Sequence, residues 1–172
     1  ATGSYSITYQ DNQFTVNVVG ATTDYAAAES RAIGAGRFFT ADEYQQSAQV
    51  VMIGTTTAEN LFGADDPIGK TIRVQSMLVQ VIGVLEETGT GDNTVVMPLT
   101  TFKARLKSAY TTDGQSIVNT ILVQATDSTQ VDAATTELKT VLRQERGIAA
   151  GEIDNFTVST AATIVSSLNS IL

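Results

Sequence analysis

The stretch that sets the fold class is Val50-Val51-Met52-Ile53-Gly54, a short and wholly apolar run that ends at a glycine. A run of this length and composition predicts a β-strand that is buried on both faces. A helix is expected directly after it, because Thr56 and Glu59 have the spacing of a capping box and Gly63 stands where helices commonly end. The middle of the chain is therefore expected to hold a buried strand followed by a helix.

Further strands are expected on both sides of this run. Before it, Ser4–Tyr9 and Phe14–Val19 are rich in β-branched and aromatic residues and predict a hairpin. After it, the expected elements are strands at Thr71–Val74, Leu78–Leu85 and Thr94–Met97 and a helix that begins at Pro98. That helix would carry Leu99, Phe102 and Leu106 on one face.

The C-terminal third has the pattern of strand, helix and strand. The strands are expected at Ile117–Gln124 and Phe156–Ser159, and the longest helix at Thr129–Arg146, with Gly147 as its stop. If the two strands are parallel neighbours, this βαβ unit needs a right-handed crossover. Residues 161–172 have apolar side chains at helical spacing, and they are expected to form a stalk helix that continues towards a membrane.

This order of elements predicts an α+β fold with two lobes. Residues 1–31 and 115–172 would form an α/β lobe built on the βαβ unit, with the stalk helix from about residue 161. Residues 32–114 would form an inserted β-rich lobe.

The composition excludes several functions. Lys and Arg total 10 and Asp and Glu total 18 among 172 residues, so the net charge is 10 − 18 = −8. Nucleic-acid binding needs clustered basic side chains, which this balance does not favour. The chain has no His and no Cys, so Ser-His-Asp and Cys-His catalysis, zinc-thiolate sites and iron–sulfur sites are excluded within it. We expect no catalytic residues, no cofactor and no metal site in this chain.

Two glycine motifs and two acidic pairs are expected to be structural. Five residues separate Gly63 from Gly69 where a P-loop has four, and a helix precedes them where a P-loop has a strand. Gly34-Ala35-Gly36 lacks the strand and helix of a dinucleotide site, so it is expected to be a turn. The adjacent acids Asp65-Asp66 and Glu86-Glu87 are poor catalytic pairs, because neighbours in a strand point to opposite faces.

Six motifs follow one another along residues 36–100: Gly36-Arg37-Phe38-Phe39-Thr40 with Asp42; Val50-Val51-Met52-Ile53-Gly54; Ala58 with Leu61-Phe62-Gly63; Pro67-Ile68-Gly69-Lys70-Thr71-Ile72; Val79 with Val81-Ile82-Gly83-Val84-Leu85; and Val95 with Met97-Pro98-Leu99-Thr100. In this order and spacing they resemble the periplasmic core domain of MacB-type ABC transporter permeases, in the FtsX-like permease superfamily. The similarity is dense over about residues 14–106. A strand and helix that the family has ahead of Ser4–Val19 are expected to be missing or shortened.

The resemblance implies a place and a set of partners. Such domains lie on the extracytoplasmic face of the cell membrane, anchored by flanking transmembrane helices. The two lobes would then be a porter-like βαβ lobe and an inserted, Sabre-like β-rich lobe. ATP would be hydrolysed by a separate nucleotide-binding domain, so this domain is not expected to be an enzyme. The implied partners are the cognate ABC ATPase, reached through the membrane helices, an adaptor protein and a second permease copy; nucleic acid is not among them.

Two functions from different classes remain open at this point. The first is mechanical transmission, in which the domain couples cytoplasmic ATP hydrolysis to substrate export or partner control. The alternative is an extracytoplasmic binding module that regulates a cell-wall hydrolase or handles lipoproteins or peptides. The polar loop over residues 86–93 offers candidate partner contacts at Glu86, Glu87, Asp92 and Asn93. A hydrolase that uses carboxylates alone is a third and weaker hypothesis, because no acidic pair has a supporting frame.

Overall fold

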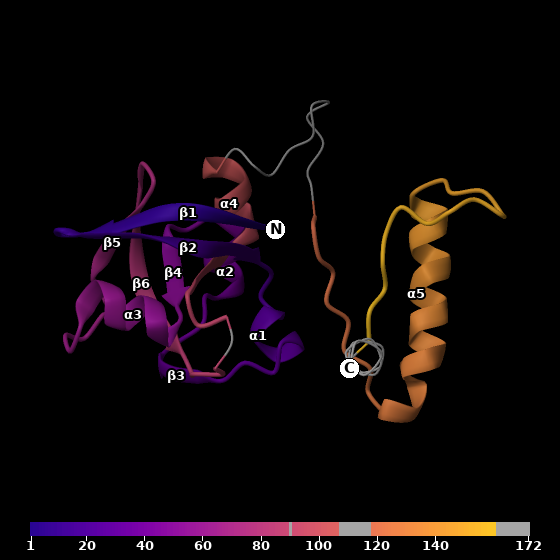
Figure 1. The fold of residues 1–172 in the computed structure, drawn as a ribbon, viewed down its shortest axis with the longest axis horizontal. Helices are drawn as coiled ribbons and strands as arrows, with labels where there is room; N and C mark the ends of the chain where they lie inside the picture. The colour runs from indigo at the N-terminus through magenta and orange to yellow at the C-terminus, as the bar shows by residue number, and fades with distance from the viewer. Residues whose placement is uncertain (90, 107–117, 161–172) are drawn as a thin grey trace, which may run out of the picture. The chain divides into compact units, whose positions relative to one another are not determined.

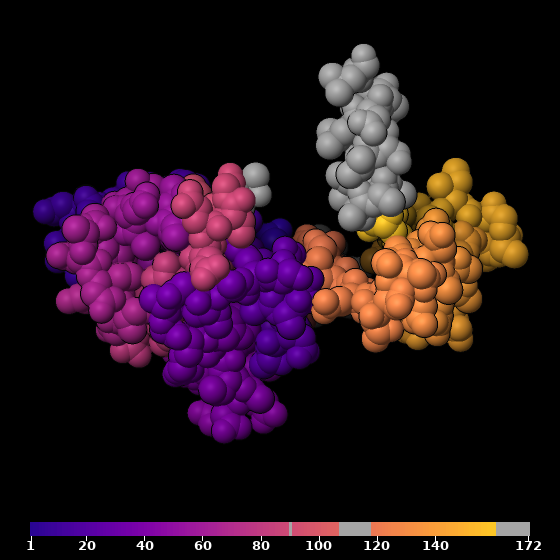
Figure 2. All heavy atoms as spheres, turned by 90° about the horizontal axis from the view of Figure 1, so that it is seen from below, coloured from indigo at the N-terminus to yellow at the C-terminus, as the bar shows by residue number. Residues whose placement is uncertain are grey.

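The computed structural model describes residues 1–89, 91–106 and 118–160, and the chain divides into two compact units, Ala1–Leu122 and Val123–Leu172 (Figure 1). The elements of the first unit are β1 (Thr2–Tyr9), β2 (Asn12–Ala21), α1 (Tyr25–Ala28), β3 (Ile33–Gly36), α2 (Ala41–Gln45), β4 (Val50–Ile53), α3 (Thr55–Phe62), β5 (Thr71–Val74), β6 (Met77–Leu85), β7 (Thr94–Pro98) and α4 (Leu99–Arg105). In Figure 2 their side chains, coloured indigo to pink, form one continuously packed body.

The strands of this unit form a sheet that closes on itself. Their order is β3-β6-β4-β7-β2-β1-β5, and β5 pairs with β6 as well as with β1. The pairs β2–β7 and β4–β6 are parallel, whereas the other neighbours are antiparallel. Closure gives each of these six strands a neighbour on both sides over at least part of its length, and it leaves β3 as a short appended edge.

The main core fills the inside of this closed sheet. Alternate residues of six strands point inward, as the two-residue period of a strand requires. They are Tyr5, Ile7, Val16, Val18, Val51, Ile53, Ile72, Val74, Met77, Val79, Val81, Val95 and Met97. Helix α3 adds Leu61 and Phe62 to the same cluster, and α4 adds Phe102, whose ring meets Tyr5 edge-on with the centroids 6.0 Å apart.

A second, smaller core covers the outer face. Met52, Val96 and Ile82 point outward from the sheet and pack with Phe39 and Leu85. Tyr25 of α1 and Tyr44 of α2 cover this cluster. Strand β4 contributes Val51 and Ile53 to one core and Met52 to the other, so the prediction of a strand buried on both faces is confirmed.

The predicted helices of this unit are present, but one predicted cap is wrong. Helix α3 begins after Gly54 without a side-chain cap, so Thr56 and Glu59 form no capping box. The capping box lies instead at Thr40 and Glu43 at the start of α2, a helix that the sequence reading missed. There Glu43 also pairs with both terminal nitrogens of Arg37 at 2.7 Å. The hydrogen bonds from Arg37 are the main cause that lowers the pKa of Glu43 to about 2.

The glycine motifs have the structural roles expected of them, with one correction. Residues 34–36 belong to strand β3 rather than to a turn, and they pair with the C-terminal half of β6. Gly36 has a φ of +72°, and a Cβ there would lie 2.3 Å from the carbonyl oxygen of Ile82, so this position requires glycine. Gly63 ends α3 at a φ of +61° and Gly69 leads into β5.

In place of the predicted βαβ unit, residues 123–160 hold one long helix. A 3-10 turn (Ser128–Gln130) leads into α5 (Val131–Glu145), and Gly147 follows at a φ of +63°. The strands predicted at Ile117–Gln124 and Phe156–Ser159 are wrong, because residues 118–124 and 156–159 pair with no strand of the described residues.

The observed units also differ from the predicted lobe boundaries. The hairpin of β1 and β2 belongs to the same closed sheet as β3–β7, through the pairing of β2 with β7. Residues 1–31 therefore lie in the β-rich unit rather than with residues 123–172. The predicted stalk helix at 161–172 lies outside the described residues. In the described part of the chain, no helix is both long and apolar enough to cross a bilayer.

Candidate partner-contact surface

The loop between β6 and β7 is organised around the carboxylate of Asp92. One oxygen of this carboxylate accepts a hydrogen bond from the backbone N–H of Gly89 at 2.8 Å, and both accept from Thr88 N–H at 3.2 Å. The hydroxyl of Thr88 donates to it as well, at 3.1 Å. The side chain of Asp92 is only 7% exposed. These bonds hold Thr88 and Gly89 against one carboxylate, so the polar side chain of Asp92 stabilises the loop itself.

Arg31 ties this loop to the segment between α1 and β3. Its guanidinium donates to Asp92 at 2.6 Å and to the carbonyl oxygen of Gly91 at 3.3 Å, and the arginine side chain is 9% exposed. Burial alone raises the pKa of Asp92, but the hydrogen bonds from Thr88 and Gly89 and the charge of Arg31 outweigh it, so the pKa lies below its usual value.

The lowered pKa of Asp92 predicts how the loop responds to acid and to a substitution at this residue. Because the folded-state pKa of Asp92 is depressed, its stabilising contribution is present above the ordinary value of 3.8 and is lost as pH falls through the folded-state pKa. Asp92→Asn should mimic this loss at neutral pH, and the amide protons of Thr88 and Gly89 should then exchange about tenfold faster with solvent. Nuclear magnetic resonance measures this rate. Asp65→Asn, on an exposed turn, is the control; equal rates in both variants would contradict the assignment.

The structure separates the four predicted contact residues. Glu86 and Glu87 are exposed, whereas Asp92 is buried and used within the loop. Asn93 is exposed, and its side chain donates to the carbonyl oxygen of Thr15 at 3.3 Å. A contact role for Glu86, Glu87 and Asn93 stays a prediction. For Asp92 a structural role accounts for the burial and the hydrogen bonds.

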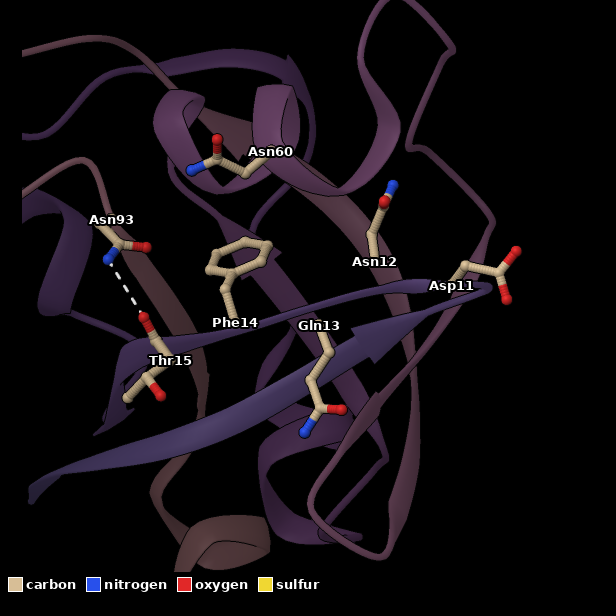
Figure 3. Close-up of a pocket in the computed structure, with 7 residues that line it drawn as sticks. All are labelled: Asp11, Asn12, Gln13, Phe14, Thr15, Asn60 and Asn93. Carbon is tan, nitrogen blue, oxygen red and sulfur yellow. Dashed lines mark hydrogen bonds between the residues drawn. The ribbon is translucent and has the colours of Figure 1, made fainter.

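A groove lies beside Asn93 that the sequence reading did not find. It has a volume of about 550 Å³ and is lined by Asp11, Asn12, Gln13, Phe14, Thr15, Asn60 and Asn93. Figure 3 shows Phe14 and Asn12 pointing towards the helix that carries Asn60, and Gln13 pointing to the opposite side of the hairpin. The amide of Asn12 donates to the carbonyl oxygen of Leu61 at 2.9 Å, which holds the hairpin against α3.

The chemistry available in this groove is hydrogen bonding to neutral polar groups. Primary amides dominate its lining, and each offers both donors and acceptors. Asp11 is the only charged residue in that lining. In the described part of the chain, no cluster of three or more acidic side chains could hold a metal ion. The arrangement is therefore suited to the recognition of polar groups by hydrogen bonds.

Comparison with known proteins decides the family. The model of the MacB-like periplasmic core domain matches residues 1–141. The chain belongs to this family. The resemblance identified from the six sequence motifs is thereby confirmed, and family membership supports an extracytoplasmic location.

Several relatives of this chain share one name. The macrolide export ATP-binding/permease protein MacB of Chlorobaculum tepidum is 30% identical over 162 residues, which cover 91% of this chain and 24% of the relative. The protein of that name from Bdellovibrio bacteriovorus is 28% identical over 176 residues, covering 99% of this chain and 26% of the relative. The chain thus spans about a quarter of the length of the curated relatives that it matches.

Two solved structures have the same fold. The periplasmic region of MacB from Actinobacillus actinomycetemcomitans superposes with a TM-score of 0.82 at 23% identity, over 98% of this chain and 73% of that one. The extracellular domain of the noncanonic ABC-type transporter YknZ from Gram-positive bacteria gives a TM-score of 0.72 at 24% identity, over 86% of this chain and 73% of that one. The mixed α/β, sheet-rich architecture is therefore that of a MacB-type periplasmic domain.

Proposed function

We propose that this periplasmic core domain transmits movement within an ABC transporter permease, coupling ATP hydrolysis by a cytoplasmic domain to events outside the membrane. The observation that carries the proposal is the family match over residues 1–141. The strands of the first unit, which lies within this match, close into a ring around a packed core. Packed protein interiors have low compressibility, so a displacement applied at one end of such a body is transmitted to the other end.

The partners follow from the same proposal. The ATPase would act through transmembrane helices that flank the domain in the whole permease. An adaptor protein and a second copy of the permease are further proposed partners, and the domain itself would carry out no chemical step. The fold supports this role because movements of this kind are rigid-body rotations and hinge motions of whole units.

The test uses the whole permease with its ATPase in lipid nanodiscs. This chain has no cysteine, so spin labels can be placed at Leu78→Cys, whose side chain is 55% exposed, and at a second cysteine in the membrane-spanning part. The distance between these labels should change when vanadate traps the nucleotide-bound state. A control pair within the first unit, Leu78→Cys with Asp24→Cys, should keep one distance. If the first distance stays the same while ATP is hydrolysed, the proposal is wrong.

A further inference from the structure

Strand β2 has two neighbours, β1 and β7, and it extends beyond the end of β7. It pairs with β1 from Asn12, opposite Tyr9, to Val19, opposite Thr2. Its pairing with β7 begins only at Asn17, opposite Thr94. In the described residues, the first five residues of β2 therefore have a strand on one side only. The groove described above lies along this open segment.

The register shows which backbone groups face the groove. Neighbouring residues of a strand direct their N–H and C=O groups to opposite sides. The N–H of Asn17 points away from β1, because it donates to the carbonyl oxygen of Asn93 at 3.4 Å. By the same alternation, Gln13 and Thr15 also direct their backbone groups away from β1. The carbonyl of Thr15 accepts from the side chain of Asn93, which leaves the N–H of Thr15 and both groups of Gln13 facing the groove.

We propose that this open edge of β2 and its groove bind an extended polypeptide segment of a partner protein, which adds as a short strand beside Gln13–Thr15. A peptide fits because its own N–H and C=O groups repeat with the spacing of the exposed ladder groups. Asn60 and Asn93 flank the edge with amide side chains that can pair with further peptide groups. The half-buried ring of Phe14 offers an apolar contact between them.

The charge of the groove indicates which peptides it could bind. Asp11 is the only charged lining residue, and the chain carries a net charge of −8. An acidic peptide would be repelled, so the segment should be neutral or basic. This inference does not depend on the transmission of movement, because a docking edge could serve a static complex equally well.

The first experiment selects peptides and locates their binding by hydrogen exchange. A displayed library of random seven-residue peptides is selected against the 172-residue chain, and the binders are synthesised. Bound peptide should slow the amide exchange of Gln13 and Thr15. The exchange of Phe14 and Val16 should change little, because these amides already face β1. If no peptide is selected, or if binders leave the exchange of Gln13 and Thr15 unchanged, the proposal is wrong.

Two variants test the edge by independent means. Gln13→Pro removes a backbone N–H that makes no bond to β1, together with one exposed side-chain bond to Ser6 at 2.9 Å. The hairpin should therefore stay folded while the added strand is blocked. Asn60→Arg fills the groove from the exposed side of α3. Each should weaken binding of the selected peptide about tenfold, whereas the neighbouring control Glu59→Gln should leave it unchanged. Thermal melting checks that each variant is folded.

A sugar is the competing occupant of a groove lined by amides. Chitotetraose is therefore titrated in parallel, with the amide resonances of Gln13, Thr15 and Asn60 as the readout. No shift is expected with this probe. Saturable shifts with chitotetraose and none with the peptides would overturn the proposal.

Discussion

Phe102→Ala is expected to lower the free energy of unfolding of the first unit by about 3–5 kcal/mol. The ring is fully buried inside the closed sheet and meets Tyr5 edge-on. It also lies against Gly20, where even a Cβ would come within 2.7 Å of it. Because Gly20 has no side chain to fill the space, truncation leaves a cavity that only backbone movement could close on the Gly20 side. Urea unfolding followed by circular dichroism measures the loss.

The matched control for this change is Leu78→Ala in β6. Leu78 is 55% exposed, so its truncation removes a large apolar side chain without opening a cavity. We expect its effect to stay within about 0.5 kcal/mol. Equal losses from the two truncations would show that Phe102 does not anchor α4 in the core.

Gly54→Ala is expected to destabilise the first unit by about 3 kcal/mol. Gly54 links β4 to α3 with an ordinary negative φ of −76°, so the alanine backbone itself is not strained. A Cβ at this position would nevertheless lie 2.1 Å from the carbonyl oxygen of Asp92. That atom belongs to the backbone of the loop closed by Arg31, so it cannot move without breaking the loop's hydrogen bonds.

The control for this substitution is Gly34→Ala in β3. The nearest atom to a Cβ at Gly34 is 3.4 Å away and belongs to the flexible side chain of Glu86. Gly34→Ala should therefore be tolerated, with little change in the urea midpoint. The close approach of Gly54 to Asp92 would be contradicted if Gly34→Ala lowered the free energy of unfolding as much as expected for Gly54→Ala, or if Gly54→Ala did not lower it.

Much of the first unit could be predicted from local patterns. The apolar run at β4, the hairpin of β1 and β2 and the helix after Pro98 were all found, because burial imposes a period on nearby residues. The closure of the sheet was not found. It depends on β5 pairing with both β1 and β6. A short stretch of sequence does not indicate which distant strand it will pair with.

The errors in the C-terminal third of the chain have a related cause. Residues 118–124 are rich in β-branched and apolar side chains, which suits a strand, yet a strand also needs a hydrogen-bonded neighbour. The described residues supply none. The composition of this segment therefore shows that it could form a strand. It does not show whether a partner strand lies beside it.

The candidate site was predicted only in part, for reasons of distance along the chain. A loop rich in Gly, Thr and acids suggests exposure, but Asp92 is buried because Arg31 reaches it from 61 residues away. The groove was missed because Asp11-Asn12-Gln13 reads as a simple turn between strands. The groove exists because β7 pairs with β2 only from Asn17 onwards, and no short motif encodes where that pairing begins.

The parallel pairing of β2 with β7 also governs the order of assembly during synthesis. Asn17 meets Thr94 across 94 − 17 = 77 residues of chain, so the N-terminal hairpin is made long before its neighbour. Until β7 emerges on the far side of the membrane, the backbone N–H and C=O groups of β2 from Asn17 onwards have no strand to pair with on that side. Contacts between such distant segments form slowly, and a nascent chain of this kind stays exposed to aggregation and proteolysis while it waits.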